Sequence, residues 1–270
     1  MDTVMICTLC SILGSMAAAP GDGLNETDAY REWAGSGVVR CWWAQRVPGE
    51  FVQRVVPDAA ADVIVASTGA AYLVGPTLSP ALHRLPPGTE LRGLRLRTEA
   101  IAAVLDLPGH EVRDAVVPLT AVLPDAAARA VADSVWRGSF PSALSPRAGD
   151  ARVRHAVSRI WGGASLDSVA DEVSLTGRQL RRLFTEQVGL GPKALQRVVR
   201  FQRFLRSADA ARPSSLADSA AAAGYADQAH LTRETRELAG VTPAVLVRER
   251  HGLAAPDATA AVAMFQGTAC

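Results

Sequence analysis

The sequence that decides the fold is VADEVSLTGRQLRRLFTEQVGLGPKALQRVVRFQRFL at residues 169–205, followed by SLADSAAAAGYADQAHLTRETRELAGVTPAVL at residues 215–246. The second stretch repeats the pattern of the first. Positions in the longer helical run recur 51 residues later: Leu180, Arg182, Gly189 and Pro192 correspond to Leu231, Arg233, Gly240 and Pro243. Upstream of the turn the offset is 50, so one copy carries an extra turn residue. A repeat of this length predicts two copies of one helical unit.

Each copy is predicted to fold as a helix-turn-helix. In the first copy a short helix over 166–173 leads into a longer one over 176–188, and the second copy has 216–223 and 227–239. Thr176 and Asp227 are good N-cap residues. Gly189 and Gly240 stand where a helix C-cap needs the left-handed conformation. The order of helix, turn and helix is that of DNA-binding units.

The longer helix of each copy has one apolar face and one polar, arginine-rich face. At 100° per residue, Leu180, Leu183 and Phe184 lie on one side of the first helix, opposite its arginines. Such a helix fits the major groove, where arginine grips guanine and threonine or alanine meets a thymine methyl. Between the units, one helix is predicted over 192–206, about 22 Å long. It would hold the two reading helices about one DNA turn, ~34 Å, apart.

An arginine-rich face on a single helix is more often plain solvated surface than a binding site. The duplication favours binding, and the charge distribution agrees. Residues 1–149 carry a net charge of −3, whereas residues 150–252 carry +5, and 15 of the 16 basic residues in that second range are arginine. Arginine suits phosphates and guanine edges better than lysine does. The sequence therefore indicates double-stranded DNA as the partner.

The two quoted stretches resemble the DNA-binding domain of the AraC/XylS family of bacterial transcription regulators, over about 100 residues. The family's most recognisable part is the run from Gly224 to Arg233, with Gly240-Val241-x-Pro243 after it. Two residues depart from the family pattern: Thr235 replaces a core phenylalanine, and Ser174 replaces a turn glycine. The resemblance and the helical faces together give the expected DNA-contacting residues: Arg178, Gln179, Arg181, Arg182, Ala229, His230, Thr232, Arg233 and Arg236. Arg182 and Arg233 could instead brace a phosphate or a carboxylate, and His230 could cap or pack.

The N-terminal half is predicted to be rich in antiparallel strands, as a small barrel or sheet followed by helices, which makes the chain α+β. Short apolar runs between turn residues predict strands over 38–44, 51–56, 62–67, 71–74, 81–85 and 91–97. A change to helical periodicity after Thr98 predicts helices near 100–105 and over 124–135. The stretches 55–64, 74–76 and 91–96 also resemble a sensor-like domain that precedes this DNA-binding module in actinobacterial regulators.

Several residues of this half could contact an effector. Asp58 and Asp62 could hydrogen-bond it, although Pro-Asp before a strand is more often only a turn. Trp42, Trp43 and Phe51 could line a pocket, although aromatic side chains in strands are more often core.

We expect a disordered extension over 1–36, a sensor or dimerisation domain over 37–137, a linker over 138–150, the DNA-binding domain over 151–252 and a disordered tail over 253–270. The apolar run near the N-terminus lacks the positive charge of an export signal and is too short to span a bilayer. The four cysteines suggest no disulfide framework. A cytoplasmic protein with no membrane partner is expected.

The alternative to a regulator is an enzyme, because this module is sometimes fused to a DNA-repair domain with a reactive cysteine. Cys41 has no Cys-His partner nearby in sequence, and the Cys7-x-x-Cys10 pair lacks a second pair at zinc spacing. A P-loop, a dinucleotide motif and a nucleophile elbow are all missing from the sequence. We therefore expect no catalytic residues, no cofactor and no metal. RNA polymerase, a small-molecule effector and a second copy of the chain stay open as partners beyond promoter DNA.

Overall fold

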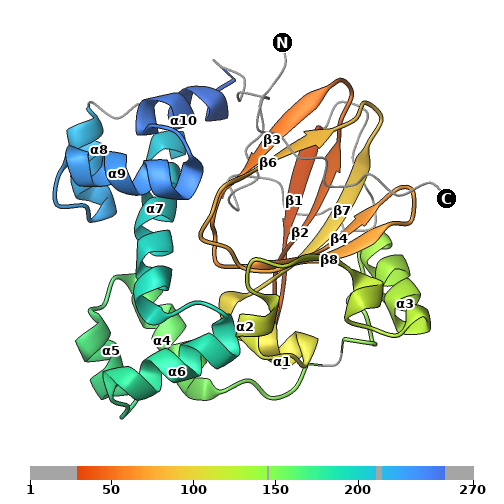
Figure 1. The fold of residues 1–270 in the computed structure, drawn as a ribbon, viewed down its shortest axis with the longest axis horizontal. Coiled ribbons are helices and arrows are strands. Elements are labelled where there is room, and N and C mark those ends of the chain that lie inside the picture. The colour runs from red at the N-terminus through yellow and green to blue at the C-terminus, as the bar shows by residue number, and fades with distance from the viewer. Residues whose placement is uncertain (1–28, 145, 211–214, 253–270) are drawn as a thin grey trace.

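The computed structural model describes residues 29–144, 146–210 and 215–252. In this part of the chain, a β-rich N-terminal domain lies beside a helical C-terminal domain (Figure 1). The strands are β1 (Tyr30–Ala34), β2 (Val39–Arg46), β3 (Phe51–Val55), β4 (Ala61–Ala66), β5 (Ala71–Val74), β6 (Ala81–Leu85), β7 (Glu90–Leu96) and β8 (Val116–Pro118). The fold is α+β, as predicted.

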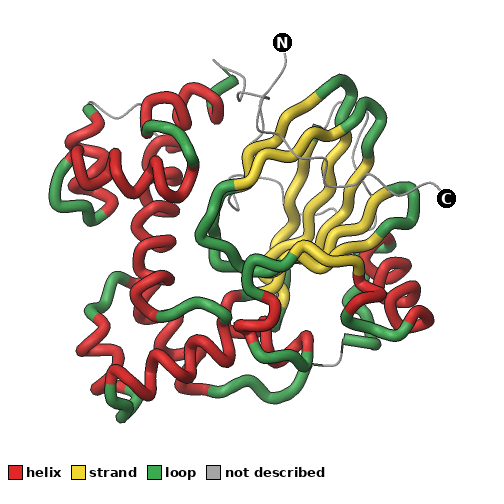
Figure 2. Tube along the Cα trace, viewed as in Figure 1, coloured by secondary structure: helices red, strands yellow, loops and turns green. Residues whose placement is uncertain are grey.

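The strands form two antiparallel sheets. The larger has the order β1-β2-β7-β4-β5-β8, and the smaller is the pair β3-β6. Figure 2 shows that the strands of the two sheets lie together and curve, with helices on either side of them. All six strands predicted from the sequence are present, with ends that differ by at most two residues.

Two strands were not predicted. β1 lies within the range expected to be a disordered extension, so that expectation is wrong for Tyr30–Ala34, which pairs along its whole length with β2. β8 has three residues and pairs with β5 at the sheet edge. β8 is stabilised by a strand distant in sequence, which local periodicity does not report, whereas β1 pairs with β2, the next strand along the chain. Residues 1–28, with Cys7 and Cys10, and the tail 253–270 lie outside the described residues.

Short helical segments and one longer helix complete the N-terminal domain. They are η2 (Thr98–Ala100), α1 (Ile101–Leu105), α2 (Gly109–Val112), η3 (Leu119–Ala121) and α3 (Asp125–Trp136). α3 packs its buried Ala128, Val131 and Val135 into the main core of the domain, against β4 and β7. Leu144, 3% exposed, belongs to the same core, so the expected linker is partly packed against this domain.

The C-terminal domain contains the predicted repeat. Its helices are α4 (Ala151–Gly162), α5 (Leu166–Glu172), α6 (Gly177–Val188), α7 (Pro192–Ala210), α8 (Leu216–Ala223), α9 (Gln228–Ala239) and α10 (Pro243–Arg250). Thr176 and Asp227 are the N-caps of α6 and α9, and Gly189 and Gly240 are their left-handed C-caps. These predictions are confirmed. No helix in the described ranges has the length and apolar character needed to cross a bilayer.

The connecting helix is longer than predicted. α7 has 19 residues and ends at Ala210 rather than at Arg206, so its length is about 28 Å. Its last turns pack Phe204, Leu205 and Ala208 out of solvent, which holds the helix together beyond the predicted end. Figure 1 shows α7 as the spine between the α5–α6 unit and the α8–α9 unit.

Ser174 occupies the strained turn position that the sequence indicated. Its φ is +53°, and the matching residue of the second unit is Gly224 at φ +87°. A left-handed conformation costs an L-residue about 1–2 kcal/mol, and glycine at this position would remove that strain. Glycine also increases the conformational entropy of the unfolded chain, which offsets part of the gain in stability.

Replacing Ser174 with glycine is therefore expected to raise the free energy of unfolding by about 0.5–1 kcal/mol in urea titrations. Ser174 is exposed, so little packing is lost. Ser174→Ala, which keeps the Cβ, should give no gain. Equal effects of the two substitutions would show that backbone strain is not stored at this turn.

Candidate nucleic-acid interface

The outward face of α6 is basic and exposed. Arg178, Arg181 and Arg182 are all exposed, while Leu180, Phe184 and Val188 of the same helix are buried in the core of the first unit. The capping box of Thr176 and Gln179 fixes the start of the helix. The helix therefore presents three guanidinium groups on a rigid scaffold.

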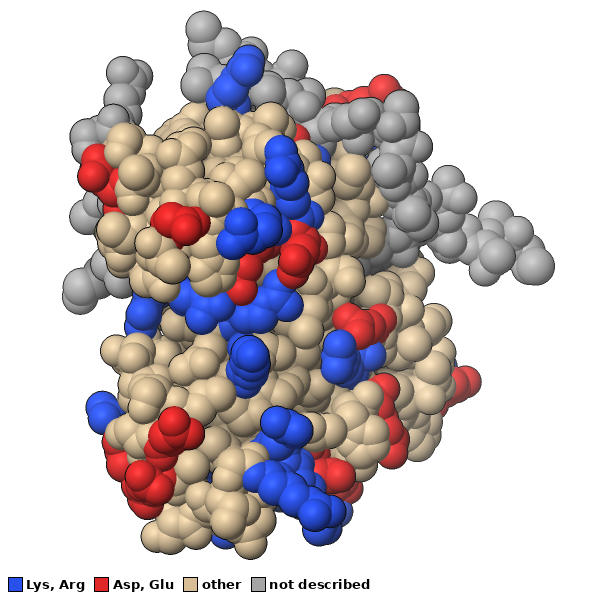
Figure 3. All heavy atoms as spheres, turned by 60° about the vertical axis from the view of Figure 1, so that its left-hand side comes forward, with Lys and Arg blue, Asp and Glu red and all other residues tan. Residues whose placement is uncertain are grey.

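α9 repeats this arrangement in the second unit. Leu231 and Leu238 are buried, whereas Ala229, Arg233 and Arg236 are exposed. The space-filling view shows basic side chains over both lobes of this side of the molecule and in the region between them (Figure 3).

The arginines on these two faces are free of internal partners. In the described part of the chain, no hydrogen bond or ion pair is made by the side chains of Arg178, Arg181, Arg182, Arg233 and Arg236. Arg197 and Arg200 of α7, in contrast, both bind the Glu234 carboxylate, at 3.0 and 2.9 Å. α7 and α9 are thus fixed to each other by ion pairs, and five guanidinium groups are left to face solvent.

Three of the other predicted contact residues, Gln179, His230 and Thr232, have internal partners. The Gln179 Oε1 accepts from the Thr176 amide at 2.9 Å, so its side-chain nitrogen is the group left for a contact. His230 packs edge-on against Tyr225 and lies 3.7 Å from Glu234, which fits the packing role weighed for it. The Thr232 hydroxyl donates to the Gln228 carbonyl at 2.8 Å. Burial raises the pKa of the Tyr225 hydroxyl well above its ordinary value, so Tyr225 stays neutral in this cluster.

Thr235 departs from the repeat in the way that the sequence predicted. It is fully buried at the position matching the buried Phe184, and its hydroxyl has no hydrogen-bond partner in the described residues. The core of the second unit is completed instead by Phe201, Phe204 and Tyr225.

The loop between β3 and β4 of the N-terminal domain contributes residues to the cores of both helix-turn-helix units. Val56 belongs to the core of the second unit, and Ala59 to the core of the first. Ala59 is fully buried at φ +59°, and the Gln202 side chain of α7 donates to the Pro57 carbonyl at 2.6 Å. The sequence predicts a turn or an effector contact at Asp58 but no contact with the C-terminal domain, because a loop gives no periodic signal.

A buried ion pair adds a second junction between the domains. The Arg54 side chain of β3 binds Glu249 of α10 through two nitrogens, at 2.7 and 3.1 Å. It also donates at 2.8 Å to the carbonyl of Ala239, the last residue of α9. The C-terminal end of the second reading helix is thereby held by the N-terminal domain.

A cavity of about 290 Å³ lies between the two sheets. Its polar lining includes Gln45, Gln53 and the Asp62–Arg95 pair, in which Arg95 Nε lies 3.1 Å from Asp62 Oδ1. Burial raises the pKa of the Asp62 carboxyl, against the opposing effect of Arg95. Gln45 is 3% exposed, and its Oε1 has no hydrogen-bond partner in the described residues.

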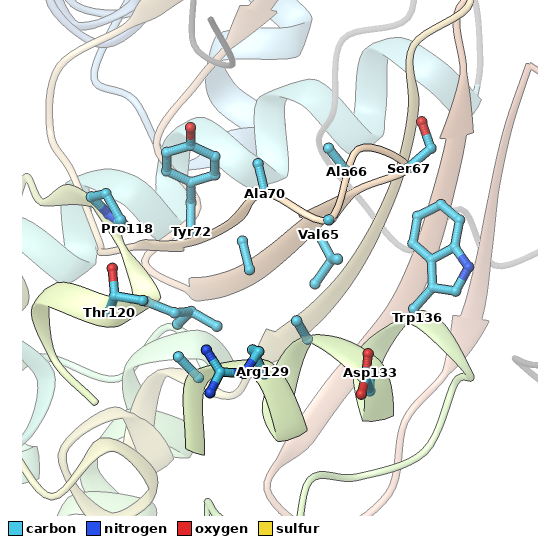
Figure 4. Close-up of a pocket in the computed structure, with 15 residues that line it drawn as sticks. Val65, Ala66, Ser67, Ala70, Tyr72, Pro118, Thr120, Arg129, Asp133 and Trp136 are labelled. Atoms are coloured by element: carbon cyan, nitrogen blue, oxygen red, sulfur yellow. The ribbon is translucent and has the colours of Figure 1, made fainter. Parts of the chain in front are cut away.

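Of the residues proposed for a pocket, Trp43 and Asp62 line this cavity, and the Trp43 indole donates to Asp62 at 2.9 Å. Asp58 and Phe51 are not in its lining, and Trp42 packs in the main core on the other side of β2. A polar residue on one face of a strand, such as Gln53 of β3, is the sequence signal that could have indicated this cavity. A larger cavity of about 580 Å³ opens between the β4–β5 turn and α3, and Arg129 and Asp133 of α3 are among its lining residues (Figure 4).

Cys41 does not resemble a reactive nucleophile. It is 1% exposed and lies in an apolar cluster with Trp43, Val47 and Leu91. A buried thiol in apolar surroundings is inert compared with the exposed thiolates of catalytic sites.

Two family models match the chain. Residues 169–249 match a model described as a helix-turn-helix domain, and residues 36–118 match a domain of unknown function, DUF6597. The first match covers both reading helices, and the second covers the sheet from before β2 to β8. No curated protein gives a significant match.

The similar solved structures are of ToxT from Vibrio cholerae. One at 1.65 Å resolution has 8% identity and a TM-score of 0.38, covering 82% of this chain and 99% of ToxT. Another, from strain O395, has 10% identity and a TM-score of 0.41, covering 77% and 91%. A third, of wild-type ToxT with bound unsaturated fatty acid, has 10% identity and a TM-score of 0.38, covering 85% and 96%.

The domain match agrees with the resemblance seen in the sequence and with the paired helices seen in the structure, and it indicates regulation of transcription rather than catalysis. The chain is a DNA-binding transcription regulator with an AraC-type helix-turn-helix domain at its C-terminal end, preceded by a DUF6597 domain.

Proposed function

We propose that α6 and α9 read two successive major grooves of one DNA site, and that the N-terminal domain controls how they are placed. The observation that carries this proposal is the set of five unpaired arginines on the outward faces of two helices joined by one rigid helix. Guanidinium groups without internal partners are available for guanine edges and phosphates. The length of α7, about 28 Å, approaches one DNA turn, ~34 Å.

The reading residues in this proposal are Arg178, Arg181 and Arg182 on α6, and Ala229, Thr232, Arg233 and Arg236 on α9. Gln179 and His230 lie at the starts of the helices and take part in capping and packing. We assign them mainly to placing each helix in its groove.

The experiment that tests the function is a footprint of the full chain on the DNA upstream of its own and neighbouring genes, across a salt series. A single chain per site should protect about two major-groove turns, and affinity should fall steeply with salt because bound arginines release counterions. Protection of one groove only, or binding with no sequence preference against competitor DNA, would contradict two-groove reading.

Replacing Arg178 or Arg181 with alanine is expected to weaken specific binding by about 1–3 kcal/mol for each lost base contact. The dependence of DNA affinity on salt separates the two kinds of contact. Loss of a phosphate contact lowers the slope of log affinity against log salt concentration by about 1, whereas loss of a base contact relaxes sequence specificity. Arg129→Ala, at an exposed position on α3, is the matched control. Unchanged specific affinity in both α6 variants would mean that the reading face is wrongly assigned.

Control by the N-terminal domain rests on the cavity between the sheets. Gln53 and Val55 of β3 line that cavity, and the residue between them, Arg54, holds the end of α9. A ligand that moves β3 would therefore move a contact of the second reading helix. We propose that a small amphiphilic effector binds here, with a hydrogen-bond donor for the buried Gln45 oxygen.

This part of the proposal is tested by screening small organic compounds for thermal stabilisation of the full chain, and then for a change in DNA affinity. Compounds that bind in the cavity but leave DNA affinity unchanged would contradict effector control. The competing role for the domain is self-association alone. In the described residues the exposed large apolar side chains are Val116 and Val245, and neither belongs to α3, the longest helix of this domain.

A further inference from the structure

A third cavity, separate from the one between the sheets and from the one beside α3, lies at the boundary of the two domains. It has a volume of about 310 Å³. The N-terminal domain contributes Arg40 of β2 and residues 97–99, which follow β7, and the C-terminal domain contributes residues from α4 and α7. We call it the arginine cleft, after four of its lining residues: Arg40, Arg97, Arg154 and Arg206.

The positive charge in the arginine cleft is poorly neutralised. Glu99 is the one carboxylate in the lining of the cleft. Asp58 is outside the lining, and its carboxylate lies 3.8 Å from Arg40. Arg97 and Arg154 donate to the backbone carbonyls of Gly37 and Gly149, contacts that orient a guanidinium group without neutralising it. Arg206 has no carboxylate partner in the described residues. Partial desolvation and the nearby charges of Arg203 and Arg40 lower the pKa of Arg206.

Trp161 organises the arginine cleft. The guanidinium carbons of Arg40 and Arg206 lie 5.7 and 5.8 Å from the centre of its indole ring. These two arginines come from different domains, and both are placed by one aromatic side chain of α4. The Trp161 backbone carbonyl also accepts from Arg203 at 2.7 Å. The like charges are therefore held together by the fold rather than spread out in solvent.

We propose that the arginine cleft binds a small phosphorylated anion, which bridges the two domains. A phosphoryl group supplies two negative charges and three acceptor oxygens, which suit several guanidinium forks at once. A single carboxylate would neutralise only one of the four arginines. The volume admits more than inorganic phosphate, so pyrophosphate or a nucleoside polyphosphate is the chemical class that fits.

The cleft differs from the DNA-reading surface. None of its lining residues belongs to α5, α6, α8 or α9, and four of them belong to the N-terminal domain: Arg40, Arg97, Thr98 and Glu99. An anion bound here would offset the repulsion between Arg40 and Arg206 and so favour the docked arrangement of the domains. A ligand can shift such an equilibrium only through its different affinity for the two arrangements.

The test is calorimetric titration of the full chain, without DNA, with pyrophosphate, with ATP, and with sodium sulfate at matched ionic strength. We expect saturable binding of one phosphorylated anion per chain, and binding at least tenfold weaker in Arg154→Gln/Arg206→Gln, as lost charge-assisted hydrogen bonds require. Both arginine side chains are exposed, so the variant should fold. Arg129→Gln/Arg248→Gln removes two exposed arginines elsewhere and should bind as the unmodified chain does.

Pyrophosphate and ATP distinguish a plain phosphate site from a nucleotide site, and either result supports the proposal. Hydrogen exchange of α4 and of residues 97–100 should slow when the anion is bound, because the anion contacts both domains. Three results would overturn the proposal: no saturable binding, equal binding of sulfate, or loss of DNA affinity in Arg154→Gln/Arg206→Gln with unchanged anion binding. The last would make the cleft a contact for DNA phosphates.

Discussion

Replacing Glu249 with leucine is expected to lower the free energy of unfolding of the full chain by about 3–5 kcal/mol. The Arg54 and Glu249 side chains are 5% and 2% exposed, so the substitution leaves a buried guanidinium group without its counter-charge. The carbonyl of Ala239 would remain as its hydrogen-bond acceptor, and a carbonyl does not neutralise the charge. Urea denaturation followed by fluorescence measures the loss.

The double variant Arg54→Met/Glu249→Leu should recover most of that stability, because two apolar side chains replace the whole pair and no buried charge is left. Arg147→Leu is the control for an exposed pair: Arg147 and Asp106 are 71% and 59% exposed, and loss of such a pair should change stability by less than about 1 kcal/mol. A double variant no more stable than Glu249→Leu would show that the loss came from packing of leucine rather than from unpaired charge.

The stability change has a functional counterpart. Arg54 is the link between the cavity-lining strand β3 and the C-terminal end of α9, so both variants remove the link. The double variant is the informative one, since it separates domain coupling from folding. If the N-terminal domain controls DNA binding through β3, the DNA affinity of the double variant should no longer respond to ligands in the cavity, although the chain remains folded.

The repeat and its caps could be predicted from the sequence because local chemistry decides them. A threonine before Gly177, a glycine after Val188 and an apolar spacing of three and four residues each act within one helix. The same reasoning found Ser174 and Thr235 as departures, because a duplicated unit supplies its own comparison. The strands over 39–96 were found for a similar reason, since turn residues separate them.

The junction between the domains could not be predicted, because its residues meet across large sequence separations. Arg54 and Glu249 are 195 positions apart, and Gln202 reaches the Pro57 carbonyl across 145. From the sequence alone, an arginine in a strand and a glutamate in a helix are predicted to be solvated, because nothing local indicates that they pair. The four arginines of the cleft come from four different segments, so no window of sequence contains them together.

Replacing Gly189 with alanine is expected to lower the free energy of unfolding by about 2–4 kcal/mol, from two separate effects. Gly189 is the C-cap of α6 at φ +81°, a conformation that costs an alanine about 1–2 kcal/mol. An added Cβ would also lie 2.4 Å from the carbonyl oxygen of Gly109 in α2. Backbone atoms cannot rotate away, so α2 and α6 must separate.

Gly240 offers the matched control, because it is the same position in the second unit. It is the C-cap of α9 at φ +73°, but its Cβ would meet only side-chain atoms of Pro80 and Arg54, at 3.5 and 3.6 Å. Gly240→Ala should therefore lose about 1–2 kcal/mol, from backbone conformation alone. Denaturant midpoints at constant slope give both values. If the two variants lost equal stability, the approach of Gly109 to Gly189 would contribute nothing. A larger loss at Gly189 would instead locate part of the stability of the first reading helix in its contact with the N-terminal domain, so that this domain holds both units, α6 at Gly109 and α9 at Arg54.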